Sequence, residues 1–130
     1  AGKFARTPGK HYRLGIGSGA LRSEIDFVLR RTTITDRFEV IVAAGDVPHS
    51  KPDPAAYLAA HAAFNRRRAL EARACVVIED SLPGLSAARA AGMPCVMLAT
   101  SHPADMLRQR GVPLVWDSLS GHQAAELADL

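Results

Sequence analysis

Residues 76–93 read VVIEDSLPGLSAARAAGM, and this stretch decides the fold. It opens with a short run of β-branched residues that ends in two adjacent carboxylates, Glu79 and Asp80. A helical pattern follows, in which Ser81 with Pro83 is typical of a helix start and Gly92 of a helix end. The stretch therefore predicts a buried strand that turns directly into a helix, with an acidic pair at the turn.

Apolar runs and helical patterns alternate in the same way along the rest of the chain, as is typical of βαβ units with a parallel sheet. The expected strands are Tyr12–Gly17, Glu39–Ala44, Cys75–Ile78, Cys95–Ala99 and Val112–Trp116. The expected helices begin after Ser18, run from Asp53–Pro54 through Phe64, begin at Ser81, run from Pro103 through Arg110, and lie around Gln123–Leu127. In the first helix, Leu21, Ile25, Val28 and Leu29 are predicted to share one face. We expect residues 1–130 to form a single α/β domain.

The composition limits the class of protein. With 130 residues, of which 48% are hydrophobic and 22% charged, the chain has the balance of one globular domain. It lacks the run of roughly 18 apolar residues that a membrane span requires, and its first residues do not resemble a secretory signal. We therefore expect a cytoplasmic protein, in which Cys75 and Cys95 are small buried residues rather than a disulfide. The run Arg66–Arg68 fits the end of a helix, so nucleic-acid binding is disfavoured.

Ligands of open parallel sheets bind beyond the carboxyl ends of the strands. Ser18 and Gly19 follow the first expected strand and offer a hydroxyl and backbone N–H groups to an anion. The alternative is a capping serine with a glycine turn. Lys51 follows the second strand in GDVPHSKPDP (45–54), where the prolines restrict the backbone and aim its ammonium. The alternative for Lys51 is a solvated loop lysine.

The acidic pair ends the third expected strand. Adjacent carboxylates are costly unless a cation or hydrogen bonds hold them, and oxygen ligands of this kind suit Mg²⁺. The alternative is that Asp80 or Ser81 caps the following helix, although Asp80 can act both as a cap and as a metal ligand. The remaining acids of the lysine loop, Asp46 and Asp53, are interpreted as a turn residue and a helix cap.

Together these segments resemble the core of the haloacid dehalogenase superfamily, in particular its β-phosphoglucomutase-like phosphatase branch. LGIGSGA (14–20) resembles the second motif of the family, GDVPHSKPDP its third, and VVIEDSLPGLSAARAAGM its fourth, and the likeness extends over about residues 12–120. It implies a three-layer, Rossmann-like core with a mostly parallel sheet and Mg²⁺ as cofactor. By this resemblance Ser18, Gly19 and Lys51 bind the phosphoryl group, Lys51 also contacts the nucleophile, and Asp80 with Glu79 binds the metal.

The resemblance also shows what this sequence lacks. The family's nucleophile belongs to an Asp-x-Asp motif on the central first strand, and no Asp-x-Asp occurs in these 130 residues. A helical cap domain is not apparent either. The resemblance thus implies a truncated core that does not form a phosphoenzyme alone. Loss of the central strand leaves two half-sheets with open edges, so either the flanking strands pair directly or another chain supplies strand pairing, and we expect a homodimer across the gap.

Three functions remain open at this point. The first is a truncated hydrolase, phosphatase- or phosphomutase-like, whose ancestral substrate is a small phosphorylated metabolite. The second is a non-catalytic module that binds phosphate, a metal ion or a partner. The third is a subunit that a partner chain completes with the nucleophile.

Overall fold

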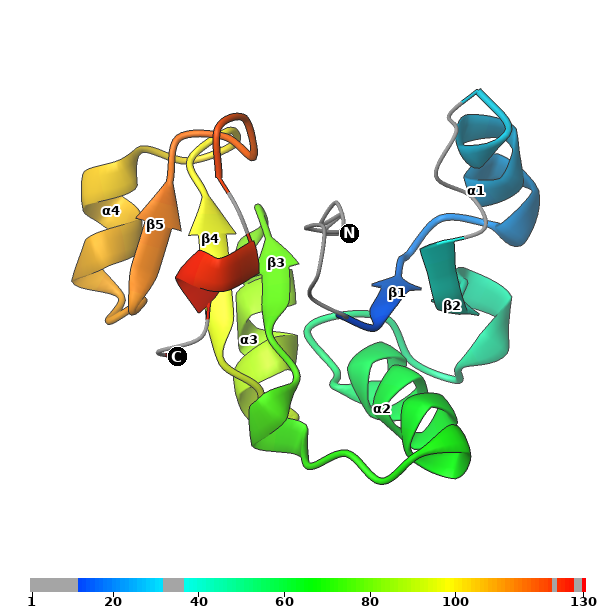
Figure 1. Cartoon of the computed structure of the whole chain (residues 1–130). Helices are drawn as coiled ribbons and strands as arrows, with labels where there is room; N and C mark the ends of the chain where they lie inside the picture. Colours follow the sequence, from blue (N-terminus) through cyan, green and yellow to red (C-terminus); the bar gives the residue numbers. More distant parts are fainter. Residues whose placement is uncertain (1–11, 32–36, 123, 128–129) are drawn as a thin grey trace.

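The fold is described by a computed structural model that covers residues 12–31, 37–122, 124–127 and 130 (Figure 1). Its strands are β1 (Leu14–Gly17), β2 (Phe38–Val42), β3 (Val77–Glu79), β4 (Cys95–Leu98) and β5 (Leu114–Trp116). Its α-helices are α1 (Arg22–Leu29), α2 (Ala55–Arg67), α3 (Leu82–Ala90) and α4 (Ala104–Gln109). Short 3₁₀ helices occur at η2 (Ala44–Asp46), η3 (Ala72–Ala74) and η4 (Ala124–Leu127). Each expected element is present with shifted ends, the last one as a 3₁₀ helix, and Gln123 lies outside the described residues.

The strands form two separate parallel sheets. In one, β1 pairs with β2, with Gly17 opposite Val42. In the other the order is β3-β4-β5, with Glu79 opposite Met97. Within the described residues β1 and β3 do not pair with each other. The predicted parallel arrangement is confirmed. Two arrangements were expected in place of the central strand, and one of them, direct pairing of the flanking strands β1 and β3, is not formed among the described residues.

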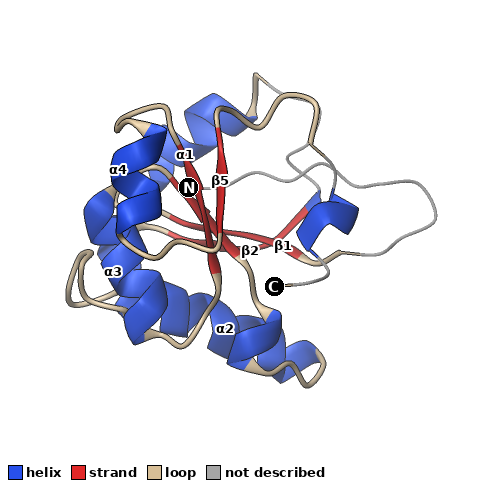
Figure 2. Ribbon diagram, turned by 90° about the vertical axis from the view of Figure 1, so that its left-hand side faces the viewer, coloured by secondary structure: helices blue, strands red, loops and turns tan. Residues whose placement is uncertain are grey.

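Helices cover both faces of the strands, which gives the expected three layers (Figure 2). In the three-stranded half, Val77 and Met97 point to the side of α3 and α4, where they join a core with Leu85 and Leu107. The alternate residue Ile78 points to the other side and packs with Trp116 and, beyond it, with η4. Successive strand residues point to opposite faces, so short apolar runs buried on both faces produce this arrangement.

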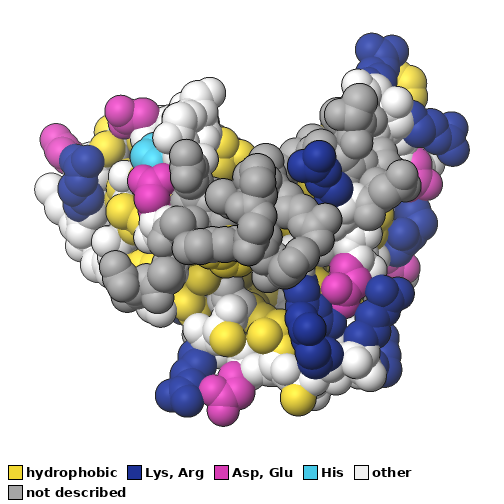
Figure 3. All heavy atoms as spheres, in the orientation of Figure 1, with side chains coloured by type: hydrophobic (Ala, Val, Ile, Leu, Met, Phe, Trp, Pro, Cys, Tyr) yellow, Lys and Arg dark blue, Asp and Glu magenta, His cyan; other side chains and the backbone are white. Residues whose placement is uncertain are grey.

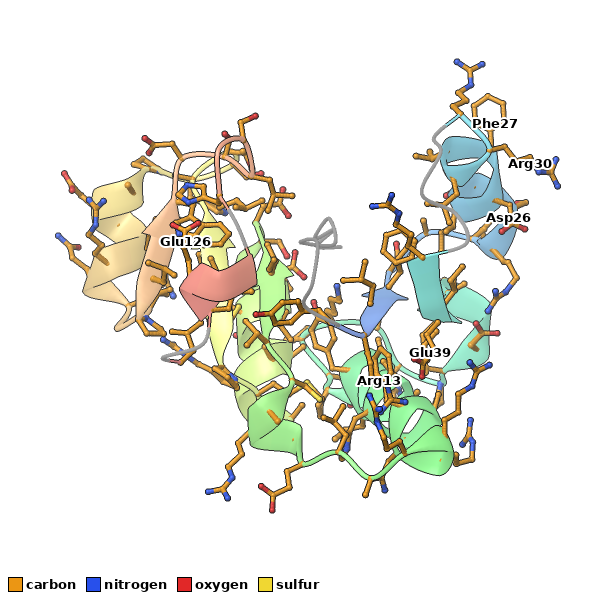
Figure 4. The ribbon with its side chains drawn as sticks, viewed as in Figure 1. Arg13, Asp26, Phe27, Arg30, Glu39 and Glu126 are labelled. Carbon is orange, nitrogen blue, oxygen red and sulfur yellow. The ribbon has the colours of Figure 1, made fainter. Side chains whose placement is uncertain are left out.

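The two-stranded half is also covered on both faces. Ile25 and Leu29 of α1 pack on one face of β1–β2, and Phe64 of α2 packs on the other. The expected four-residue apolar face of α1 is wrong in part, since Leu21 and Val28 are 56% and 50% exposed. Two strands offer too little surface to cover a wider stripe of the helix. Figure 4 shows the labelled side chains of α1 projecting away from the body of the molecule.

Helix α2 connects the two halves. Its residue Phe64 belongs to the core of the β1–β2 half, whereas Tyr57 packs with Val77 in the core of the other half. Helix α2 approaches β1 at two glycines: a Cβ on Gly15 would lie 2.8 Å from the Phe64 ring, and one on Gly17 would lie 3.3 Å from Tyr57. The small residues of β1 therefore let one helix serve both half-sheets.

Two further expectations can be compared with the described residues. Both cysteines are free thiols, Cys95 fully buried and Cys75 partly so. In the described part of the chain, no helix has both the length and the apolar character needed to cross a membrane.

Candidate phosphate and metal site

Lys51 lies at the centre of the candidate site. Its Nζ donates to the carbonyl oxygen of Gly17 at 3.0 Å and to Oε2 of Glu79 at 2.9 Å. The ammonium also lies 4.7 Å from the centre of the Tyr57 ring. One side chain thus joins the carboxyl end of β1 to the carboxyl end of β3, and the alternative of a solvated loop lysine is wrong. The fold brings the second, third and fourth sequence motifs together at this point.

Glu79 is a buried carboxylate with every oxygen engaged. It is 3% exposed. Its Oε2 accepts a 2.6 Å hydrogen bond from the Tyr57 hydroxyl in addition to the one from Lys51. Its Oε1 accepts from the backbone N–H of Asp80 at 3.1 Å and from the Ser81 hydroxyl at 3.3 Å. Burial by itself raises the pKa of Glu79, but the bonds from Tyr57 and Lys51 lower it to about 2, so the carboxylate is charged at neutral pH.

The start of α3 is shaped around this carboxylate. Ser81 is the helix cap, and its Oγ accepts from the backbone N–H of Gly84 at 3.1 Å. A Cβ on Gly84 would lie 2.1 Å from the carboxyl group of Glu79, so only glycine leaves room for the buried side chain. The motif EDSLPG therefore encodes both the helix start and the space for the acid.

Asp80 has different surroundings from its neighbour. Its Oδ2 accepts a 3.0 Å hydrogen bond from Ser101, which follows β4. Because Ser81 caps α3, the carboxylate of Asp80 is not used as the cap. Asp80 is half-buried at the carboxyl end of β3. Among the described residues, no group of three or more His, Cys, Asp or Glu side chains could together hold a metal ion.

Ser18 and Gly19 form the turn after β1. The backbone N–H of Ser18 donates to Val42 at 2.9 Å, and its Oγ accepts from the backbone N–H of Ala20 at 3.0 Å. Helix α1 begins only at Arg22 with Leu21 as its cap, so Ser18 is not a helix cap but stabilises the turn. Gly19 is exposed, and no atom lies within 4 Å of the position where its Cβ would be.

The two other acids of the lysine loop both have structural roles. Oδ2 of Asp46 accepts from the backbone N–H of Ala43 at 2.8 Å and from Arg22 at 2.7 Å. Oδ1 of Asp53 accepts from the backbone N–H of Ala55 at 2.9 Å, at the start of α2. Asp46 is the turn residue that was expected, but the prediction of Asp53 as the helix cap is wrong by one position, because Pro54 is the cap of α2 and Asp53 bonds to Ala55 from the residue before it.

Sequence reasoning missed three residues of the site: Tyr57, Gly84 and Ser101. The hydroxyl of Tyr57 is a partner of the buried acid, and burial together with Glu79 raises the pKa of Tyr57, so it remains a donor. Gly84 lies within the fourth motif, although nothing in the sequence marks it as the space for Glu79, and Tyr57 and Ser101 lie outside the motifs. Tyr57 is the third residue of α2, the helix that follows the lysine loop. Its closeness in sequence to Lys51 is the one signal that could have placed it near the site.

Comparison with known proteins agrees with this geometry. The family model of haloacid dehalogenase-like hydrolases matches residues 8–98. A haloacid dehalogenase-like hydrolase domain-containing protein of Arabidopsis thaliana is 35% identical over 104 residues, which cover 78% of this chain and 31% of that protein. Validoxylamine A 7'-phosphate phosphatase of Streptomyces hygroscopicus subsp. limoneus is 34% identical over 101 residues, covering 78% of this chain and 46% of that protein.

Solved structures show the same fold. CbbY from Rhodobacter sphaeroides, in complex with phosphate, superposes with a TM-score of 0.73 and 26% identity over 91% of this chain and 52% of that one. This chain therefore spans less than half of the two curated relatives and about half of the structure. The motifs, the strand arrangement and the family match agree, and this chain belongs to the haloacid dehalogenase-like hydrolase family, in its phosphatase branch.

Proposed function

We propose that this chain binds a phosphoryl group together with Mg²⁺ at the carboxyl ends of β1 and β3. The observation that carries the proposal is the position of Lys51, whose ammonium is held 2.9 Å from Glu79 and 3.0 Å from Gly17, beside the Ser18 turn. A cation in this position attracts a phosphoryl group, and the hydroxyl of Ser18 and the backbone N–H of Gly19 are donors for its oxygens.

Asp80 and Glu79 take different parts in this proposal. Both oxygens of Glu79 already accept hydrogen bonds, so we assign it to holding Lys51 rather than to direct metal contact. Among the described residues, the carboxylate of Asp80 accepts a hydrogen bond from Ser101. Its remaining oxygen lone pairs are left for an ion. Mg²⁺ commonly binds one or two carboxylates, with water and phosphate oxygens as its other ligands. Bound there, it would neutralise phosphoryl charge.

We expect binding without turnover from these 130 residues, because they contain no Asp-x-Asp. The chemistry of the family, transfer of a phosphoryl group from a small phosphorylated metabolite, requires that nucleophile. A partner chain that supplies the nucleophile is the second candidate, favoured by the separation of β1 from β3. The expected homodimer remains a prediction, which sedimentation velocity at micromolar concentration tests directly.

Thermal unfolding with inorganic phosphate and MgCl₂ tests the proposal. A ligand that binds only the folded state raises the melting temperature, so we expect stabilisation that requires both ions. Asp80→Asn should remove the Mg²⁺ dependence, and Ser18→Ala should weaken the phosphate effect. The matched control is Asp105→Asn, at a carboxylate 92% exposed in a surface pair with Arg108. An equal response of all variants contradicts the site. Mg²⁺-dependent hydrolysis of p-nitrophenyl phosphate that Asp80→Asn abolishes would contradict the absence of turnover.

A further inference from the structure

The ammonium of Lys51 has most of its hydrogen-bonding capacity in use. A lysine ammonium has three N–H donors. Two of them go to the carbonyl oxygen of Gly17 and to Oε2 of Glu79, at 3.0 and 2.9 Å. The described residues thus leave one N–H for a phosphoryl oxygen. Because that oxygen and Glu79 bond to the same ammonium, they lie no more than two hydrogen-bond lengths apart.

The carboxylate of Glu79 is fixed beside this ammonium. Its Oε2 also accepts from the Tyr57 hydroxyl at 2.6 Å, and its Oε1 accepts from Ser81 and from the backbone N–H of Asp80. Helix α3 packs directly against it, since a Cβ on Gly84 would lie 2.1 Å from the carboxyl group. A ligand cannot displace this side chain without breaking these bonds. The negative charge of Glu79 therefore stays next to Lys51, and burial protects it from screening by salt.

The charged side chains of the site leave an excess of one negative charge. Glu79 balances the positive charge of Lys51, and Asp80 adds a second carboxylate whose bond from Ser101 carries no charge. Among the described residues, the pair of Lys51 with Glu79 is the ion pair that either acid forms. An anionic phosphoryl group therefore meets a net negative charge at the metal-free site. A divalent cation at Asp80 reverses the sign of that charge.

We propose that Glu79 makes phosphoryl binding conditional on the divalent cation. By balancing the charge of Lys51 it disfavours free phosphate, while the remaining N–H of the lysine still orients a phosphoryl group that binds together with the cation. The ligand of this site is therefore a phosphoryl group with its cation rather than the free anion. This inference rests on the proposed function, and it adds the residue that imposes the requirement for both ions.

The variant Glu79→Gln tests the inference, because an amide keeps the length and an oxygen acceptor but removes the charge. Inorganic phosphate is titrated without Mg²⁺, in the presence of EDTA, and the amide signal of Gly19 is followed by NMR. We expect the phosphate affinity to rise about fivefold or more. In a separate titration with MgCl₂ and no phosphate, followed at the amide of Ser101, the Mg²⁺ affinity should fall about twofold or more, because the ammonium is no longer balanced beside Asp80. Opposite changes for the two ions distinguish lost charge from a damaged site, which weakens both.

The matched control is Glu71→Gln. Glu71 is 70% exposed in a surface pair with Arg73, before the amino end of β3, whereas Glu79 is at its carboxyl end. On the face that Figure 3 shows, acidic and basic side chains are scattered over both halves of the molecule. The loss of one such surface charge should leave both affinities within about twofold of the wild type. Metal-free phosphate affinity of Glu79→Gln that does not exceed that of the wild type and of the control overturns the inference.

A second pair of variants keeps the test decisive if Glu79→Gln alone does not fold. Lys51→Met leaves two unbalanced carboxylates, so with MgCl₂ present it should bind phosphate more weakly than the wild type. Adding Glu79→Gln removes one of them, and the phosphate affinity should recover about fivefold or more although the ammonium is still absent. A glutamate that only orients the lysine predicts no recovery, and that result overturns the inference. A wild-type chain that binds no phosphate even with MgCl₂ overturns the proposed function itself.

Discussion

Replacement of Lys51 by methionine tests the physical basis of the site most directly. Methionine keeps much of the side-chain length but removes the ammonium that contacts Glu79 at 2.9 Å. Lys51 and Glu79 are 15% and 3% exposed, so the change leaves a buried carboxylate without its cation. Removal of one partner of a buried pair typically costs about 3–5 kcal/mol. Because Glu79 keeps the hydrogen bond from Tyr57 at 2.6 Å, we expect the lower end, about 3 kcal/mol.

Urea unfolding followed by circular dichroism measures this loss. Adding Glu79→Gln to Lys51→Met removes the buried charge while an amide oxygen still accepts from Tyr57, so about 1–2 kcal/mol should return. The control is Arg73→Met, which breaks an exposed pair with Glu71, at 83% and 70% exposure, and should change stability by less than about 0.5 kcal/mol. The reasoning is refuted if Lys51→Met costs less than about 1 kcal/mol or if Glu79→Gln restores nothing in its background.

The same pair contributes to the acid stability of the metal-free protein, as do the other carboxylates whose pKa is lowered, Glu39 and Asp46. The folded-state pKa of Glu79, about 2, is below its ordinary value of 4.5. A lowered carboxyl pKa stabilises the fold above the unfolded-state value, and this contribution is lost as the pH falls through the folded-state value. The urea midpoint should therefore decrease between pH 4.5 and pH 2, and Glu79→Gln should reduce that decrease. An identical pH profile in the variant would contradict the assignment.

Three further changes are predicted. Gly84→Ala should cost about 1–3 kcal/mol by overpacking against the buried carboxylate, whereas Gly45→Ala, with no atom within 4 Å of the added Cβ, should change the urea midpoint little. Ser81→Ala removes the cap of α3 and should cost about 1 kcal/mol in the same assay; no loss would mean that the cap is dispensable. Arg13→Met should return the pKa of Glu39, which the hydrogen bond from Arg13 lowers, toward its ordinary value in an NMR titration, and an unmoved pKa would contradict the pairing.

Much of the local structure could be predicted from the sequence because it depends on local physics. The strand-to-helix turn at Glu79–Ser81, the cap at Ser81 and the helix ends at Gly92 and Gly111 follow from residue preferences that act over a few positions. The exposure of Val28 was not predictable in this way. It depends on how much sheet surface lies beneath α1, and the division of the sheet determines that surface.

The same distinction, between local residue preferences and tertiary packing, applies to the candidate site. The sequence by itself determined which polar residues follow the apolar runs: Ser18, Glu79 and Asp80 directly at the strand ends, and Lys51 in the loop after the second strand. Only the tertiary structure decided that Lys51 is paired with Glu79, that Tyr57 completes that pair, and that β1 and β3 remain apart with a cavity between them. Backbone preferences act between near neighbours, whereas these contacts join residues 22 to 34 positions apart. They form only when α2 packs against both half-sheets at once.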